Sequence, residues 1–537
     1  MASEHDRSPF SEPQFIEALP ARPSLEMQQK RAKNLHRAAA SGDAEALRRI
    51  RVLHPKPPAS DAVKLADAQL VVARGYGFES WAALRRKIES LTKTPVEQFG
   101  GALRAGDVEQ ARALLAAHAD VRASVNQPKG AFGGRPVMMA RKNLPLLDVL
   151  IEYGADLNLK SEWWAGPFGI LESDITPAEA APLIARGARV DIFAAAHLGM
   201  VERVRDLLDA DPSLVSARGG DGKTALHCAR SVAIARLLIE RGADIDARDV
   251  DHESTPAQYL VRDAPDVTRL LVERGAWVDI FIAVGLRDAA LVERCLREDP
   301  EALDHRTWQG QYTTVHAGRP SARGAIGTRR GDIYRWVFGH NVSVIEAAHM
   351  LGFDDMVRLL LRHASPAQQV LAACAVADRA AAEAVVAAHP DVVASLARDR
   401  MRLIADKAHA NDTAAVALVL DLGFDARVTG PDDFEALRWA AFHGNVEMTR
   451  RLLQHDPPIN VPDRTYGGTP LDQCVYGALQ GWNCETGDFA ATARLLLEAG
   501  ETVEPRDLPT GLDELDAVLR AYLPPQPPAS AAPPTSA

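Results

Sequence analysis

The sequence has few cysteines and few aromatic residues for its length, and it has no long apolar run. Its five cysteines in 537 residues lie far apart and form no CxxC pair, which excludes a disulfide framework and a zinc-knuckle pattern. Aromatic residues make up only 6% of the chain, so alanine and leucine supply most of the apolar mass and favour close-packed helices over a β-rich core. Because no stretch of about 18 apolar residues occurs, we expect no membrane span.

A strong charge of one sign is also missing. The formal net charge of −11 is spread over 537 residues, which favours solubility and makes nucleic acid an improbable partner, since that partner needs a strongly basic surface. The first fifteen residues contain no apolar core of the kind found in signal peptides. Together with the sparse thiols, this predicts a cytoplasmic protein; export without a cleaved signal stays open.

Sequence signatures of known active sites are absent as well. There is no HExxH, no GxSxG and no Walker-type glycine loop. Cys228 and Cys295 fall on predicted helix faces and are typical of core fillers rather than nucleophiles. We therefore predict a non-enzymatic protein with no catalytic residue, no cofactor and no metal site. A small-ligand or hydrolytic site of an unrecognised kind stays open as an alternative.

What the sequence does contain is a recurring phrase, in which a leucine-rich helix end is followed by glycine and then an acidic residue, as in RLLIERGADIDARD over 236–249. The leucines form an inward helical stripe. The glycine falls where the helix stops and where a left-handed backbone is most favourable. It recurs as Gly154, Gly187, Gly242, Gly275, Gly423 and Gly500.

The first half of the repeating unit carries a threonine followed by a small residue or proline, as in KTALHCA over 223–229, STPAQYL over 254–260 and GTPLDQC over 468–474. Threonine caps a helix N-terminus. Proline is favourable at the first helical position, because the N–H that it lacks would have no partner within the helix there. The full cycle of helix, turn, helix, glycine stop and acidic loop predicts a helical repeat protein, whose neighbouring units complete each other's core.

The unit GKTALHCARSVAIARLLIERGADIDARD over 222–249 resembles the ankyrin family, whose repeat of about 33 residues carries T-P-L-H-x-A. The resemblance extends from about residue 95 to about residue 505. Over this range the sequence resembles a degenerate, bacterial-type array of many repeats. It implies an all-α, ankyrin-type helical repeat solenoid with short hairpin loops. It also implies that His227 ties neighbouring repeats together by hydrogen bonds.

A longer period is superimposed on the repeats. RGARVDIFAAA over 186–196 matches RGAWVDIFIAV over 274–284 at an offset of 88 residues, and a weaker echo places Pro390 90 residues after Pro300. In these units an Asp-Pro or His-Pro stop replaces the Gly-Ala turn. The array is therefore predicted to have grown by copying blocks of several repeats.

These patterns divide the chain into segments of distinct character. We expect a disordered N-terminus over 1–24, a helical N-terminal capping module over 25–94, a repeat array over 95–505, a C-terminal helix over 506–522 and a disordered, proline-rich tail over 523–537. Two loop insertions, 306–341 and 476–489, interrupt the array.

The two insertions are the predicted partner-binding region. The first holds six arginines against a single acid, Asp332, with aromatic residues between them. Arginine and large aromatic side chains are enriched at interface hot spots, and long loops are often functional. The alternative is a solvated hairpin whose aromatics pack on neighbouring helices. The predicted contact residues are Arg306, Trp308, Tyr312, Arg319, Arg323, Arg329, Arg330, Tyr334, Trp336 and Trp482.

The function predicted from these features is a protein–protein interaction scaffold or adaptor. Stacked repeats leave a concave face and loop tips exposed, and such a surface suits a protein partner. A secreted effector that acts on a host protein is the rival class. The identity of the partner does not follow from the sequence.

Overall fold

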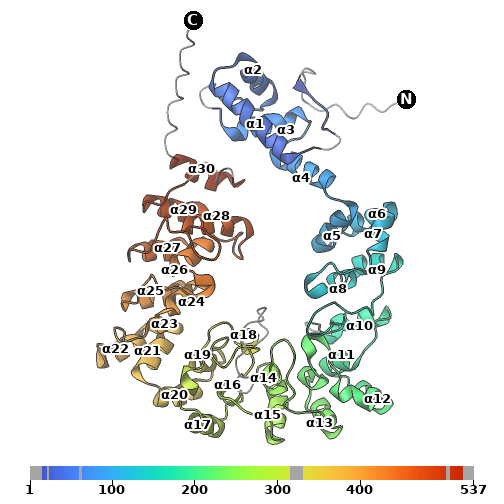
Figure 1. Cartoon of the computed structure of the whole chain (residues 1–537), viewed down its shortest axis with the longest axis vertical. Helices are drawn as coiled ribbons and strands as arrows, with labels where there is room; N and C mark the ends of the chain where they lie inside the picture. Colours follow the sequence, from blue (N-terminus) through green and yellow to red (C-terminus); the bar gives the residue numbers. More distant parts are fainter. Residues whose placement is uncertain are drawn as a thin grey trace. The chain divides into compact units, whose positions relative to one another are not determined.

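The computed structural model describes residues 15–20, 23–59, 63–172, 175–314, 330–503, 508 and 510–523. Across these residues the regular elements are α-helices and short 3-10 turns, and no strand is found among them, only two isolated bridges. The predicted all-α repeat solenoid is confirmed (Figure 1). Within the described residues, no helix is both long enough and apolar enough to cross a membrane.

Unit 1 comprises residues 1–194 together with 219–221. Its first four helices form a small bundle with its own apolar core, in which Ala32, Val72, Leu84 and Ile88 are buried. Helix pairs follow the bundle. The helices are α1 (Leu25–Ala40), α2 (Ala44–Leu53), α3 (Leu65–Gly75), α4 (Trp81–Thr92), α5 (Pro95–Ala105), α6 (Val108–Ala117), α7 (Ala119–Ala123), α8 (Pro136–Met139), α9 (Leu144–Glu152), α10 (Pro177–Ala185) and the start of α11 (Ile192–His197).

Unit 2 comprises residues 195–218 and 222–537, and most of its helices form consecutive pairs. They are α12 (Val201–Ala210), α13 (Val232–Glu240), α14 (Pro256–Leu260), α15 (Pro265–Glu273), α16 (Ile280–Gly285), α17 (Ala289–Glu298), α18 (Tyr334–Val337), α19 (Val344–Met350), α20 (Asp354–His363), α21 (Pro366–Ala375), α22 (Arg379–Ala388), α23 (Arg398–Met401), α24 (Leu403–His409), α25 (Thr413–Asp421), α26 (Ala436–Phe442), α27 (Val446–Leu453), α28 (Pro470–Gln480), α29 (Phe489–Glu498) and α30 (Asp513–Ala521).

The local signals at the helix ends behave as the sequence predicts. Thr255 and Thr469 cap α14 and α28 through their hydroxyls, and a proline follows each of them at the first helical position. The backbone angle φ lies between +87° and +100° at all six recurrent stop glycines, a left-handed conformation that a side chain with a Cβ rarely adopts.

The helix bounds repeat with the long period seen in the sequence. Helices α16 and α17 begin and end 88 residues after α11 and α12, and α22 begins and ends 90 residues after α17. The duplicated aspartates Asp191 and Asp279 have kept the same role, because each accepts a hydrogen bond from a backbone N–H three residues later. The long period is therefore structural as well as sequential.

His227 ties two successive repeats of unit 2 together, as the resemblance implies. The ring is buried, the Thr224 backbone N–H donates to its Nδ1 over 3.1 Å, and its Nε2 lies 3.1 Å from the Ser254 carbonyl oxygen. These partners require the neutral tautomer with the proton on Nε2. Burial lowers the pKa of His227 to about 3.

We predict that His227 makes unit 2 less stable in mild acid. Between its unfolded pKa near 6.5 and its folded pKa near 3, the unfolded chain binds a proton that the folded chain does not, so stability falls as the pH falls. By pH 5.5 the loss from this residue is about 1.4 kcal/mol. Urea unfolding of the wild type and of His227→Gln at pH 7.5 and 5.5 measures it: the variant starts about 1–3 kcal/mol less stable and shows a smaller acid loss. Equal acid losses would contradict this assignment.

Candidate functional site

The base of the first insertion is closed by one buried threonine. The Thr307 hydroxyl donates to the Gly339 carbonyl over 2.6 Å and accepts from the Val342 N–H over 2.9 Å. Its backbone N–H donates to the Val342 carbonyl, and its carbonyl accepts from the Asn341 N–H. The two ends of the insertion are thus fixed against each other, although residues 315–329 between them lie outside the described part of the chain.

Two of the predicted contact residues belong to the core. Tyr312 and Tyr334 are fully buried around Phe281 of α16, with ring centroids 5.1 and 4.9 Å from the Phe281 ring. The Tyr334 hydroxyl also donates to Asp279 over 2.9 Å. The insertion is therefore anchored by aromatic packing onto the neighbouring repeat, and we leave these two tyrosines out of the binding surface.

Arg306 and Arg330 are occupied by internal ion pairs. Arg306 lies 3.1 Å from Glu346, which also lies 3.0 Å from Lys407, and Arg330 lies 2.7 Å from Asp299. Burial favours neutral Glu346, but the two cations outweigh it and hold the pKa of Glu346 below its usual range. Both arginines thus fasten the insertion to the array. The predicted contacts Arg319, Arg323 and Arg329 lie outside the described residues.

The remaining predicted residues join a continuous row of rings. The aromatic row consists of Trp336, Trp308, His340, His409, Trp439 and Trp482. The Arg335 guanidinium lies 4.8 Å from the Trp336 ring centroid and 4.4 Å from that of Trp308, which bridges the two tryptophans.

Ring contacts carry the row from the first insertion to the second. The Trp308 and His340 centroids are 4.5 Å apart, and those of His340 and His409 are 6.3 Å apart. His409 then contacts Trp439 at 4.4 Å and Trp482 at 5.2 Å. The Trp439 and Trp482 rings are stacked 6.0 Å apart. Insertions that are separate in sequence therefore share one surface.

The row presents large apolar area to solvent. Trp336 and Trp482 are 66% and 65% exposed and Trp308 is 36% exposed, whereas Trp439 is buried beneath Trp482. Trp308 has φ +59°, a left-handed backbone uncommon for a bulky residue. Such conformations cluster at functional sites.

Burial keeps the histidines of the row uncharged near neutral pH. It lowers the pKa of His340 to about 4, with His409, Arg402 and Arg335 acting in the same direction. Burial also lowers the pKa of His409. The row is thus an apolar aromatic strip, and its positive charge is supplied by arginines at its edge.

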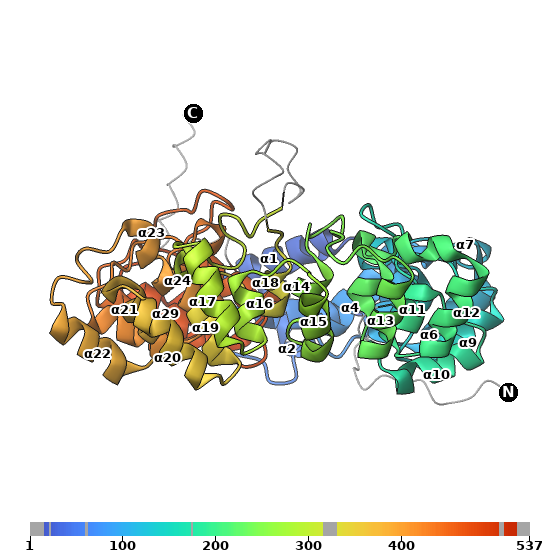
Figure 2. The same ribbon diagram turned by 90° about the horizontal axis from the view of Figure 1, so that it is seen from below.

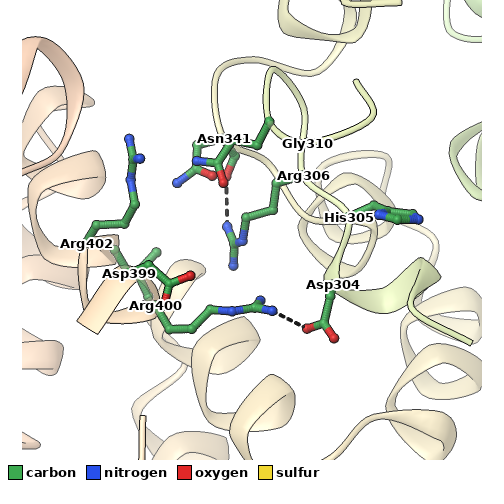
Figure 3. Close-up of a pocket in the computed structure, with 10 residues that line it drawn as sticks. Asp304, His305, Arg306, Gly310, Asn341, Asp399, Arg400 and Arg402 are labelled. Atoms are coloured by element: carbon green, nitrogen blue, oxygen red, sulfur yellow. Dashed lines mark hydrogen bonds and ion pairs between the residues drawn. The ribbon is translucent and has the colours of Figure 1, made fainter. Parts of the chain in front are cut away.

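A polar cavity of about 170 Å³ adjoins the row at Arg306 and Asn341 (Figure 3). Arg400 points to Asp304 over 2.8 Å, and Arg306 donates to the Asn341 carbonyl over 2.8 Å. Arg402 lies 3.4 Å from Asp406. Arginine and aspartate side chains dominate the lining of this cavity, which suits ion pairing.

The second insertion is shorter than predicted. Helix α28 continues to Gln480, four residues beyond Tyr476, and the chain becomes extended only at Gly481. Sequence reasoning missed that His340, His409 and Trp439 join the site. The repeat period holds a signal for His409: it is the last residue of α24, and 34 residues later His443 directly follows α26, with its Nε2 2.9 Å from the His409 carbonyl oxygen.

The fold and this surface define a helical repeat protein with an exposed aromatic strip. Family models described as ankyrin repeats match residues 192–282 and 437–478. The chain therefore contains ankyrin repeats, which are protein–protein interaction modules.

Similar proteins are known from animals and plants. The chain is 31% identical over 141 residues to the mouse Ankyrin repeat and SAM domain-containing protein 6, covering 25% of this chain and 16% of that protein, and 30% identical over 142 residues to the rat protein of the same name. It is 23% identical over 290 residues to the E3 ubiquitin-protein ligase KEG of Arabidopsis thaliana, covering 47% and 18%. The chain thus spans less than a fifth of the length of these relatives, and the bacterial character of the array stays a prediction.

We predict that Arg306 stabilises unit 2. Arg306→Met leaves the buried Glu346 carboxylate with Lys407 as its one remaining cation, and we expect a loss of about 3 kcal/mol. Urea unfolding measures the loss. The control is Arg297→Met on the exposed side of α17, which should change stability by less than about 0.5 kcal/mol. Equal stability of both variants would contradict this role and would leave Arg306 available for contact with a partner.

Proposed function

We propose that this protein is a non-enzymatic scaffold or adaptor that holds a partner protein along the aromatic row. The observation that carries the proposal is the pair of tryptophans, Trp336 and Trp482, which are each about two-thirds exposed at opposite ends of one connected strip. Tryptophan and arginine are the residue types most enriched at interface hot spots. Ankyrin repeats elsewhere in the same unit support a protein as the partner.

The apolar area of the two exposed tryptophans is large enough to support specific binding. A large aromatic side chain buries about 150–250 Å² at an interface, so covering either exposed tryptophan contributes about 3 kcal/mol. Trp439 stacks on Trp482, and Arg335 holds Trp336 beside Trp308. These contacts already restrict the exposed side chains, so little conformational entropy is left to lose on binding. The row is thus organised before the partner arrives.

The edge of the row favours acidic groups on the partner. Arg335 stacks over two tryptophans. Arg400 and Arg402 line the adjoining cavity, each also paired with an aspartate of the fold, Asp304 and Asp406. Guanidinium groups pair with carboxylates in a planar, two-point geometry. We therefore propose a partner segment that combines apolar or aromatic anchors with at least one acidic side chain.

We also propose that the protein works in the reducing environment of the cytoplasm. All five cysteines are free, and three of them are buried. Burial raises the pKa of Cys295 to about 11 and that of Cys374 to about 12, which keeps both thiols protonated and unreactive. A fold that relies on unpaired thiols suits a compartment in which disulfides rarely form.

We predict that Trp336→Ala/Trp482→Ala removes partner binding. Each truncation deletes about 3 kcal/mol of apolar contact, so capture of the partner from native lysate, measured by quantitative mass spectrometry, should fall at least tenfold. Trp164→Ala is the matched control, because Trp164 is 54% exposed but lies in unit 1. Circular dichroism checks that all variants are folded. Unchanged recovery of every captured protein by the double variant would refute the proposal.

A further inference from the structure

The second helices of the repeats in unit 2 do not stack evenly. In Figure 1, α15, α17 and α20 lie on one side of this unit, and α14, α16 and α19 on the other. Helices α13 and α15 pack against each other, as do α25 and α27, and α27 and α29, whereas α20 and α22, like α15 and α17 and like α17 and α20, make few contacts. Figure 2 also shows α20, α21 and α22 grouped together. Side chains of these three helices line a cavity.

The sequence of α22 explains why the cavity stays open. Apart from Arg379 and Glu383, its residues RAAAEAVVAA are alanine and valine, and Ala382 is its one buried residue among those described. Helices α27 and α29 carry leucines at the corresponding ends, and Leu452 and Leu496 are fully buried there. Alanine and valine side chains are too short to reach the neighbouring helix. Helix α22 also ends in a His-Pro stop instead of the Gly-Ala turn.

The result is an apolar groove of about 500 Å³ between α20 and α22. Val357 and Leu361 of α20 form one wall, Ala381 and Val385 of α22 form the other, and α21 forms the floor. All four wall residues are half-buried. The groove therefore exposes aliphatic side chains along both walls instead of at one isolated point.

The groove differs from the neighbouring gaps by its lack of cross-links. Ion pairs Arg287–Asp355 at 3.0 Å and His363–Glu293 at 3.1 Å connect α20 to the repeat before it, and Arg379–Asp421 at 2.6 Å connects α22 to α25. Between α20 and α22, within the described residues, there is neither an ion pair nor a hydrogen bond.

The rim of the groove on α20 carries positive charge that the fold does not use. Arg358 and Arg362 are exposed, line the groove and are one helical turn apart. In the part of the chain that the structure describes, neither arginine forms an ion pair. Asp378, which also lines the groove, accepts a hydrogen bond from the Ala381 backbone N–H of its own helix. This rim is complementary to a ligand that is apolar on one face and acidic along the adjacent edge.

We propose that the groove between α20 and α22 binds an amphipathic helix of a partner protein, with acidic residues facing Arg358 and Arg362. A helix is the fitting shape because the walls are helices with satisfied backbones and offer no strand edge for pairing. Apolar residues at positions i, i+4 and i+7 of the ligand would span about 10 Å of the roughly 15 Å length of α20. The acidic α30 of a second copy does not fit, because its apolar face is already buried.

The proposal is tested by selecting helical peptides on the full-length chain. The probe is a phage-displayed library of 16-residue helices with varied apolar residues at i, i+4, i+7 and i+11, half of them flanked by glutamate and half by lysine. We expect the glutamate-flanked half to be enriched. In fluorescence anisotropy a labelled, selected peptide should bind at least tenfold more weakly to Leu361→Asp and to Val385→Asp.

Charge reversal keeps the test decisive if an aspartate in the wall unfolds the repeat. Arg358→Glu/Arg362→Glu changes exposed residues alone and should invert the preference toward lysine-flanked peptides, whereas the control Arg297→Glu on α17 should not. Trp336→Ala/Trp482→Ala should retain full peptide binding, which separates this groove from the aromatic row.

Three results would overturn the proposal: no enrichment over the Leu361→Asp/Val385→Asp chain, equal enrichment of both halves of the library, or a preference that survives charge reversal. Sedimentation velocity of the wild type provides a further check. Self-association that is lost in Val385→Asp would make a second copy the occupant and would likewise overturn the proposal.

Discussion

Each helix pair of this protein exposes an apolar face that the next pair must cover, and every other feature depends on that stacking. The requirement is strictest between α26 and α28, where a Cβ added at Gly477 would lie 2.0 Å from the Phe442 carbonyl oxygen. Ala440 and Ala441, at the same contact, are fully buried. Backbones this close transmit any change in one repeat to its neighbours. The surface of the array is therefore set by how regularly the pairs stack.

The parts of the structure that depend on local chemistry were accessible from the sequence. Stop glycines and threonine caps act over a few residues, and the 88-residue period is visible when the sequence is compared with itself; all are present in the structure. Which aromatic side chains of the insertion are buried and which are exposed could not be predicted from the sequence. Tyr334 and Trp336 are two residues apart and equally aromatic, but one is buried against Phe281 and the other is two-thirds exposed. That choice depends on a repeat more than 50 residues earlier, which composition does not reveal.

The arginines illustrate the same limit from the side of electrostatics. Six of them in one segment suggest a binding surface, but a buried carboxylate costs several kcal/mol unless a cation accompanies it. Glu346 pairs with Arg306, and Asp299 pairs with Arg330, so these two arginines are needed inside the fold. The sequence shows the arginines together, whereas their acidic partners lie outside the insertion: Asp299 directly follows α17, and Glu346 is in the first turn of α19. Arg335 stacks on two tryptophans near the surface, with the Asp332 carboxylate 4.0 Å away.

Both proposed binding surfaces arise where stacking departs from the regular pattern: the insertion at 306–341 adds aromatic residues, and the alanines of α22 remove contact. The formal charge of −11 does not oppose acidic partners at either place. At physiological ionic strength, charges farther apart than about 8 Å are largely screened. The partner therefore experiences the nearest groups, Arg335 and Arg402 beside the aromatic row and Arg358 and Arg362 on the groove. Local departures from the repeat thus give an acidic protein two surfaces whose charge is opposite to its own.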